Sequence, residues 1–149
     1  MNRKIIPVIS CCSFLILNFI TVLNYAQESN DSFNLLKQNI TDVTIKDVNY
    51  IQYFQGKNEP CIVSFKIVNT KNEKEEEYEC NLSDLDEKKV ELNATKQSLN
   101  VECVTRKNKD LVRVYENDKI KEYTNKFIFY ATDVEKGKLI VRELHNLIK

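Results

Sequence analysis

Residues 61–68 alternate between an apolar face and a mixed one, which is the two-residue period of a half-buried β-strand. The apolar face consists of Cys61, Val63, Phe65 and Ile67. The same alternation resumes at Tyr78, Cys80 and Leu82, so we expect the two segments to pair as neighbouring strands. The charged stretch Asn72–Glu77 between them is interpreted as a solvated hairpin loop. This pattern predicts an antiparallel sheet.

Further runs of β-branched and aromatic side chains predict additional strands. These runs cover residues 44–54, 90–92, 99–103, 112–115 and 120–130. The first of them predicts one strand or two. Asn117 and Asp118 separate the last two runs, and both residue types tolerate the backbone of a tight turn. We therefore expect these two runs to form a hairpin.

Helical spacing of apolar residues occurs before and after these strands. A short opening helix is predicted from Phe33, Leu36, Ile40 and Val43. The run Thr132–Glu135 is typical of a capping box, in which the threonine hydroxyl and the glutamate carboxylate each bond a free backbone N–H group. The helix that begins there is expected to bury Ile140, Val141, Leu144, Leu147 and Ile148. Its water-facing residues are predicted to be Lys136, Lys138, Arg142, Glu143 and Lys149.

This order of elements predicts an α+β fold, a mainly antiparallel sheet or roll of six to seven strands with a short N-terminal helix and a C-terminal capping helix. Over residues 44–149 the order resembles the pleckstrin-homology-like roll, which has seven strands and a closing helix. A helix packed on an open sheet is the alternative. The runs Tyr78–Asp86 and Tyr123–Asp133 resemble small exported bacterial domains of unknown function. That resemblance implies no activity and supports one domain built from strand-plus-turn units.

The beginning of the chain has the layout of a secretory signal. Arg3 and Lys4 form a short positive segment, and the run Ile5–Leu23 that follows carries no charge. Ala26 is a small residue at which a signal peptidase can cut. We therefore expect a signal peptide over residues 1–26 and a secreted or periplasmic protein.

The expected mature protein is a single small domain over residues 27–149. An uncleaved membrane anchor is the main alternative to cleavage, because the uncharged run approaches the roughly 20 residues that a membrane span needs. Lipidation is a third alternative, since Val8–Cys11 is similar to the lipobox of bacterial lipoproteins. Association with a membrane is expected only under these two alternatives.

The charges of the chain are balanced. It has 22 basic and 22 acidic side chains, and loss of the signal would remove Arg3 and Lys4 but no acidic residue, which leaves a net charge near −2. Such a balance supplies no broad positive field for phosphate backbones or anionic lipid. Nucleic acid is therefore not an expected partner.

Three cysteines remain after the signal, namely Cys61, Cys80 and Cys103. An oxidising compartment favours pairing, which would give one disulfide and one leftover thiol. The sequence does not determine the connectivity, and Cys80 with Cys103 is the candidate pair. The alternative is three buried cysteines that act as small apolar side chains.

The sequence offers no catalytic or metal-binding motif. His145 is the only histidine and is expected at the boundary or surface of the last helix, and the chain has only two glycines, too few for a phosphate loop or a nucleophile elbow. The candidate zinc ligands are Cys61, Cys80, Cys103 and His145. No two of them have the close spacing along the chain that structural zinc sites use. The acidic corner at residues 84–87 lacks the ligand array of a calcium loop. We predict no catalytic residue, no metal site and no cofactor.

Tyr50, Tyr53 and Phe54 form the aromatic cluster best suited to recognition, and we interpret them as a candidate binding rim. The competing interpretation is that alternate members fill the core. The leading functional hypothesis is a non-enzymatic exported domain that binds a protein or envelope component through a sheet edge or this rim. The alternative is a carrier of a small apolar ligand in the roll or in a cleft between sheet and helix.

Overall fold

The computed structural model describes residues 29–57 and 61–148. The predicted signal peptide, its cleavage point after Ala26 and the lipobox at Cys11 lie outside these residues. A helix over residues 29–39 precedes the strands, and helix α2 (Val134–Ile148) follows them. From Ser32 onward the described chain forms one compact unit.

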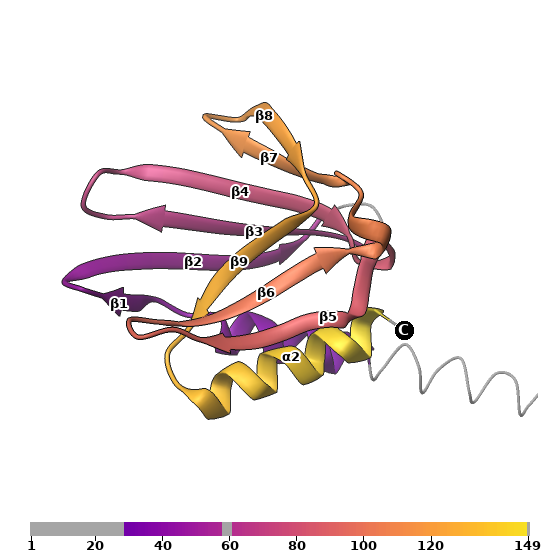
Figure 1. Cartoon of the computed structure of the whole chain (residues 1–149), viewed down its shortest axis with the longest axis horizontal. Helices are drawn as coiled ribbons and strands as arrows, with labels where there is room; N and C mark the ends of the chain where they lie inside the picture. Colours follow the sequence, from indigo (N-terminus) through magenta and orange to yellow (C-terminus); the bar gives the residue numbers. More distant parts are fainter. Residues whose placement is uncertain (1–28, 58–60, 149) are drawn as a thin grey trace, which may run out of the picture. The chain divides into compact units, whose positions relative to one another are not determined.

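Nine strands lie between the two helices in the described part of the chain (Figure 1). They are β1 (Val43–Ile45), β2 (Val48–Gly56), β3 (Ile62–Asn69), β4 (Lys74–Asn81), β5 (Leu85–Ala94), β6 (Leu99–Thr105), β7 (Val112–Glu116), β8 (Lys119–Thr124) and β9 (Lys126–Ala131). Single turns of 3₁₀ helix, η1 (Leu82–Asp84) and η2 (Arg106–Asn108), precede β5 and follow β6.

The strands form two antiparallel sheets. Six strands make one sheet in the order β1-β2-β3-β4-β7-β8, and three make the other in the order β5-β6-β9. Short turns join the paired strands β1–β2, β3–β4, β5–β6 and β7–β8. Two of these turns have left-handed residues at both central positions, Lys46 with Asp47 and Asn117 with Asp118. This backbone twist matches that of antiparallel strands. The predicted turn at Asn117 and Asp118 is confirmed.

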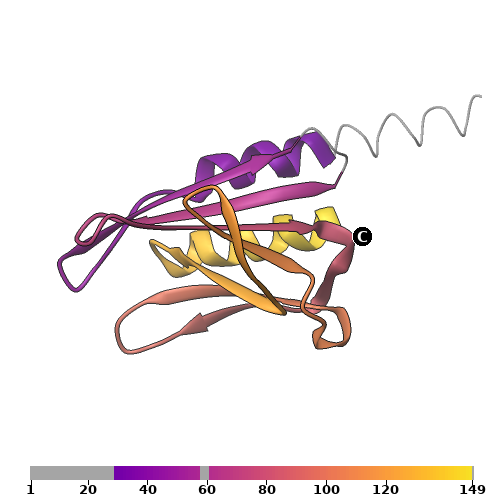
Figure 2. The same cartoon turned by 90° about the horizontal axis from the view of Figure 1, so that it is seen from above.

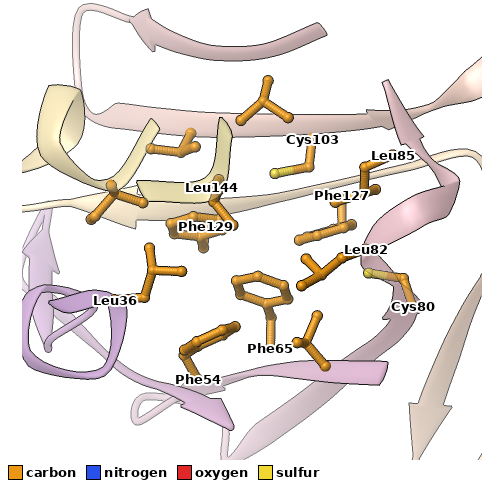
Figure 3. Close-up of a cluster of buried hydrophobic side chains, with 14 of the residues drawn as sticks. Leu36, Phe54, Phe65, Cys80, Leu82, Leu85, Cys103, Phe127, Phe129 and Leu144 are labelled. Atoms are coloured by element: carbon orange, nitrogen blue, oxygen red, sulfur yellow. The ribbon is translucent and has the colours of Figure 1, made fainter. Parts of the chain in front are cut away.

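A phenylalanine cluster joins the two sheets. Phe65 on β3 packs against Phe54 on β2 and against Phe127 and Phe129 on β9, with ring centroids 4.8 to 5.2 Å apart. Figure 3 shows these rings with Leu144 from α2 and other buried apolar side chains around them. The core therefore lies between the two sheets and includes buried side chains from both helices. We call the face of the six-stranded sheet that carries Phe54 and Phe65 the inner face.

The α2 helix lies along β5, as Figures 1 and 2 show. Gly137 permits the close approach, because a Cβ atom there would lie 2.6 Å from Cδ1 of Leu92. The predicted stripe is confirmed at Ile140, Leu144 and Ile148, which are buried.

Two predictions for α2 are wrong. The cap is Asp133 and not Thr132: the Asp133 carboxylate accepts a hydrogen bond from the backbone N–H of Lys136, so the helix begins one residue later than the capping box requires. Glu143 does not face water but is buried, because Ser32 of the N-terminal helix donates a hydrogen bond to it at 2.7 Å.

The α+β class, the antiparallel pairing and the two terminal helices are confirmed. The structure has more strands than the predicted six to seven, partly because residues 120–130 are not one strand: Asn125 separates β8 from β9, which belong to different sheets. Val43 lies in β1 and not on the opening helix. The charged stretch predicted as a loop belongs largely to β4, which begins at Lys74.

Candidate functional site

The outer face of the six-stranded sheet, opposite the inner face, carries two rows of side chains that cross the strands. One row consists of Tyr53, Lys66, Glu77, Tyr115 and Ile120, and the next of Gln55, Ser64, Glu79, Arg113 and Tyr123. Residues opposite one another in a sheet place their side chains on the same face. The outer face therefore mixes aromatic, aliphatic and charged groups.

Hydrogen bonds hold the acidic members of these rows. Glu77 Oε1 accepts from Lys57 Nζ at 2.7 Å and also from the Ser64 hydroxyl. Glu79 Oε1 accepts from Arg113 Nη1 at 2.7 Å and from the Tyr115 hydroxyl at 3.2 Å. Burial opposes ionisation of Glu77, but the bonds from Lys57 and Ser64 outweigh it and lower the pKa of this carboxyl. Both carboxylates are thus paired within the sheet.

Strand β8 is an edge of this sheet, and five of its six residues are exposed. The pairing of β7 with β8 shifts between Val114 and Tyr115, which marks a bulge. The shift brings Ile120 and Tyr123, three positions apart, to the same outer face. Their exposed fractions are 48% and 54%, so β8 presents apolar area beside an open backbone edge.

The predicted rim of Tyr50, Tyr53 and Phe54 is divided between the two faces of β2. Tyr53 lies on the outer face and is 53% exposed, whereas Phe54 is buried in the core. Tyr50 lies on the inner side, where its ring meets that of Tyr130. The three residues therefore do not form one surface, because side chains of a strand alternate in direction.

Tyr53 and Phe54 line one shared groove of about 600 Å³ beside β2. Its other lining residues are Lys37, Gln55, Lys66, Val68, Glu75 and Glu77. Two cations and two anions give this groove a mixed, balanced charge. A smaller cleft of about 250 Å³, lined mainly by uncharged polar and aliphatic side chains, lies between β1 and the β5–β6 turn.

A third cleft, which we call the tyrosine cleft, has a volume of about 240 Å³. It is lined by Tyr50, Ile67, Asn69, Lys74, Glu76, Tyr78, Ile128 and Tyr130. Strands β2, β3 and β4 supply the first six residues and β9 supplies the last two. The cleft therefore lies where β9 crosses the inner side of the six-stranded sheet.

The polar end of the tyrosine cleft is a chain of hydrogen bonds centred on Glu76. Its Oε2 accepts from the Tyr78 hydroxyl at 2.7 Å, and its Oε1 accepts from Lys74 Nζ. Burial opposes ionisation of Glu76, yet these two bonds lower its pKa. Burial, together with the bond to Glu76, raises the pKa of Tyr78, and burial likewise raises that of Tyr130. The carboxylate is therefore charged and the phenols are neutral at physiological pH.

The sequence interpretation missed Lys74, Glu76 and Glu77 as site residues because it placed them in a loop. A usable signal was present: Glu76, Tyr78 and Cys80 continue the two-residue alternation of β4 backward. The charged side chains are tolerated in the strand because lysines form ion pairs with them. Lys57 pairs with Glu77, for example, and Lys74 with Glu76.

Cys80 and Cys103, the candidate disulfide pair, are buried free thiols in the structure, and both lie at the phenylalanine cluster in Figure 3. Burial raises the pKa of Cys80 to about 12 and raises that of Cys103 well above its ordinary value. Cys61 is exposed, which corrects the alternative in which all three cysteines are buried. Both buried thiols act as apolar side chains here.

His145 is half-buried on α2, and its Nε2 lies 3.2 Å from the carbonyl oxygen of Val90. Among residues 29–57 and 61–148, no three His, Cys, Asp or Glu side chains are grouped so that they could hold a metal ion. Within the same residues no helix has the length and apolar character of a membrane span.

Comparison of the chain with known protein families, with curated proteins and with solved structures found no match. The resemblances to the pleckstrin-homology-like roll and to small exported bacterial domains therefore stay predictions.

Proposed function

We propose that the chain is an exported, non-enzymatic domain that binds a partner protein by accepting an extended segment of that protein alongside β8. The observation that carries the proposal is the combination of an exposed edge strand with two exposed apolar side chains, Ile120 and Tyr123, on one face. Main-chain hydrogen bonds at a sheet edge supply affinity, and neighbouring side chains supply specificity.

The hairpin register identifies a backbone group that such a segment would use. Glu116 and Lys119 close a two-residue turn and face each other across the hairpin. In such a hairpin the closing pair exchanges hydrogen bonds, so we expect the next residue, Ile120, to direct its N–H and C=O away from β7. These groups would then lie on the open side of β8.

The charged side chains of β8 indicate which kind of partner segment would bind. Lys119 and Lys121 lie on the strand, and lysine on an edge strand protects it against indiscriminate pairing with other strands. Lys121 already pairs with Glu116 at 3.1 Å, so an acidic segment would gain its ion pair chiefly with Lys119. The proposed partner therefore offers an extended segment in which acidic residues alternate with aliphatic ones that contact Ile120 and Tyr123.

A titration of the isotope-labelled protein with a synthetic peptide that alternates glutamate and valine tests the proposal. We expect the amide signals of β8 to shift and the Ile120 N–H to become protected from exchange. Ile120→Pro removes the donor at a position where proline is tolerated, since edge strands accept it. This variant should weaken binding roughly tenfold, which corresponds to about one lost hydrogen bond.

Two controls make the outcome decisive. Ile120→Val keeps the N–H and most of the apolar area, so it should bind the peptide like the parent. A peptide with lysine in place of glutamate should bind weakly. Equal binding of both peptides, or unchanged binding by Ile120→Pro, would show that β8 is not the docking edge.

The carrier alternative has less support. The tyrosine cleft and the groove beside β2 both contain charged side chains, and the cleft between β1 and the β5–β6 turn is lined in part by threonine, serine and glutamine. Cavities that hold small apolar ligands are lined mostly by apolar groups. An apolar ligand in any of these three clefts would leave polar groups without partners.

A further inference from the structure

The tyrosine cleft combines aromatic rings with a fixed carboxylate, and this combination favours one class of ligand. Tyr50, Tyr78 and Tyr130 line it together with Glu76. The face of an aromatic ring carries partial negative charge and attracts cations. A carboxylate in the same cleft adds a full negative charge. No residue of β8 lines the cleft, so this inference does not rest on the proposed function.

The tyrosine rings are tilted relative to one another and do not form a flat stack. The Tyr50 and Tyr130 rings have centroids 4.9 Å apart and planes tilted by 52°, so they meet as a corner. One face of the Tyr78 ring lies on Phe127, with centroids 5.6 Å apart and planes only 20° from parallel. Phe127 thus supports the Tyr78 ring, and all three tyrosines line the same cleft.

The β9 wall of the cleft is held in place by a backbone contact. Gln52 on β2 accepts a hydrogen bond from the Tyr130 N–H at 2.7 Å and donates one to the Tyr130 carbonyl oxygen at 3.0 Å. Tyr50 is two residues from Gln52 on the same strand. The corner between the Tyr50 and Tyr130 rings is consequently preformed, which reduces the entropy that a ligand must lose on binding.

The electrostatic surroundings favour a cation over an anion. Glu76 lies in the cleft, and the charge of Glu122 on β8 acts on Tyr78. Glu116 acts on Lys74. Glu76 pairs with Lys74 and Glu116 pairs with Lys121 at 3.1 Å, and Glu122 adds a further negative charge near Tyr78. The neutral phenols add no positive charge.

Lys74 does not prevent another cation from binding to Glu76. Its Nζ pairs with Glu76 from two residues away on the same strand, and its side chain is 47% exposed. Exposed ion pairs of this kind contribute little stability, so the lysine can turn into solvent when a ligand enters.

We propose that the tyrosine cleft binds the alkylated ammonium group of a small organic cation, with the three tyrosine rings around the alkyl groups and Glu76 as the counter-ion. The volume of about 240 Å³ suits a headgroup and not a long apolar chain. Quaternary ammonium groups are recognised by aromatic cages of this composition because they are cationic, apolar at their surface and weakly hydrated.

The decisive probe pair is choline and 3,3-dimethylbutanol, a neutral molecule of the same shape with carbon in place of the nitrogen. Each would be titrated into the isotope-labelled protein while the ring signals of Tyr50, Tyr78 and Tyr130 are recorded. We expect saturable shifts with choline and binding roughly tenfold weaker with the neutral molecule, because it lacks the charge.

Substitutions distinguish the loss of ligand contacts in the tyrosine cleft from a general loss of folded structure. Tyr130→Leu should reduce choline affinity roughly tenfold, whereas Tyr130→Phe keeps the ring and should retain most of it. Glu76→Gln keeps the shape but removes the charge and should also weaken binding. Lys74→Met removes the competing cation and should tighten it. Tyr53→Leu, on the outer face, is the matched control and should have no effect.

Vesicles distinguish the source of the cation. Binding to phosphatidylcholine vesicles that free choline reverses would identify a lipid headgroup, and choline binding without vesicle binding would identify a free solute. The proposal is overturned if choline and 3,3-dimethylbutanol bind equally, if choline fails to saturate at millimolar concentration, or if Lys74→Met and Glu76→Gln change affinity in the same direction.

Discussion

Gln52 on β2 and Tyr130 on β9 exchange two hydrogen bonds, although they belong to different sheets. The Gln52 side chain is buried, and its amide pairs with both the N–H and the C=O of Tyr130 as a neighbouring strand would. The Gln52 Nε2 also donates to the Thr41 carbonyl oxygen at 2.8 Å. One side chain therefore joins the six-stranded sheet to β9 and to the segment that leaves the N-terminal helix.

Gln52→Ala should lower the free energy of unfolding by about 1–3 kcal/mol, because the Tyr130 backbone groups would lose their buried partners. Chemical denaturation measures this change. Gln55→Ala is the matched control, since Gln55 lies on the same strand but is exposed on the outer face. Equal stability of the two variants would show that water replaces the Gln52 amide without loss.

Removal of the contact should also loosen the tyrosine cleft. Tyr130 would no longer be held against Tyr50, so choline affinity should fall in Gln52→Ala even where the protein is fully folded. Unchanged affinity would indicate that ring packing alone maintains the corner.

Glu143 should make stability depend on pH. Burial by itself would raise the pKa of this carboxyl, but hydrogen bonds from Ser32, Arg142 and Asn146 lower it below the ordinary value of 4.5. A carboxyl with a lowered pKa in the folded state contributes stability that is complete above the unfolded value and is lost as the pH falls through the folded one. The free energy of unfolding should therefore decrease below about pH 4.5.

Denaturation of Glu143→Gln across the same pH range checks this assignment. The variant should be less stable than the parent at neutral pH, and the difference should shrink in acid as the parent carboxylate gains a proton. Ser32→Ala removes one bond to a buried charge and should cost roughly 1.5–3 kcal/mol. A constant difference between parent and Glu143→Gln would contradict the assignment.

The three cysteines of the described residues should differ in reactivity. Cys61 is exposed and should react with iodoacetamide in the native protein, whereas Cys80 and Cys103 are buried with raised pKa values and should react only after unfolding. Mass spectrometry of the labelled protein counts the adducts. If residues 61–149 carry only the Cys61 adduct both before and after unfolding without reductant, Cys80 and Cys103 form a disulfide.

Local patterns predicted the strands and turns well where neighbouring residues decide the outcome. The alternation in residues 61–68 corresponds to β3, and the turn at Asn117 and Asp118 joins β7 to β8. Such features follow from side-chain direction and backbone preference within a few residues.

Prediction was less successful where distant residues provide the partner. From the sequence, Glu143 belongs to the polar face of its helix, and only the fold brings Ser32 to it as a buried partner. The acidic stretch of β4 has the composition of a loop, and only the fold provides Lys57 and Lys66 as partners for its carboxylates. The rim of Tyr50, Tyr53 and Phe54 was a cluster along the chain and not in space. The tyrosine cleft likewise needs Ile128 and Tyr130 from β9.

The sequence by itself determined that this protein is an α+β domain of antiparallel strands, because the two-residue and helical periods are properties of consecutive residues. Tertiary structure alone decided that β8 and β9 separate at Asn125, that Gln52 meets Tyr130, and which charged groups are buried. The physical reason is that a hydrogen bond or ring contact between distant segments depends on their packing, and no pattern within either segment specifies it.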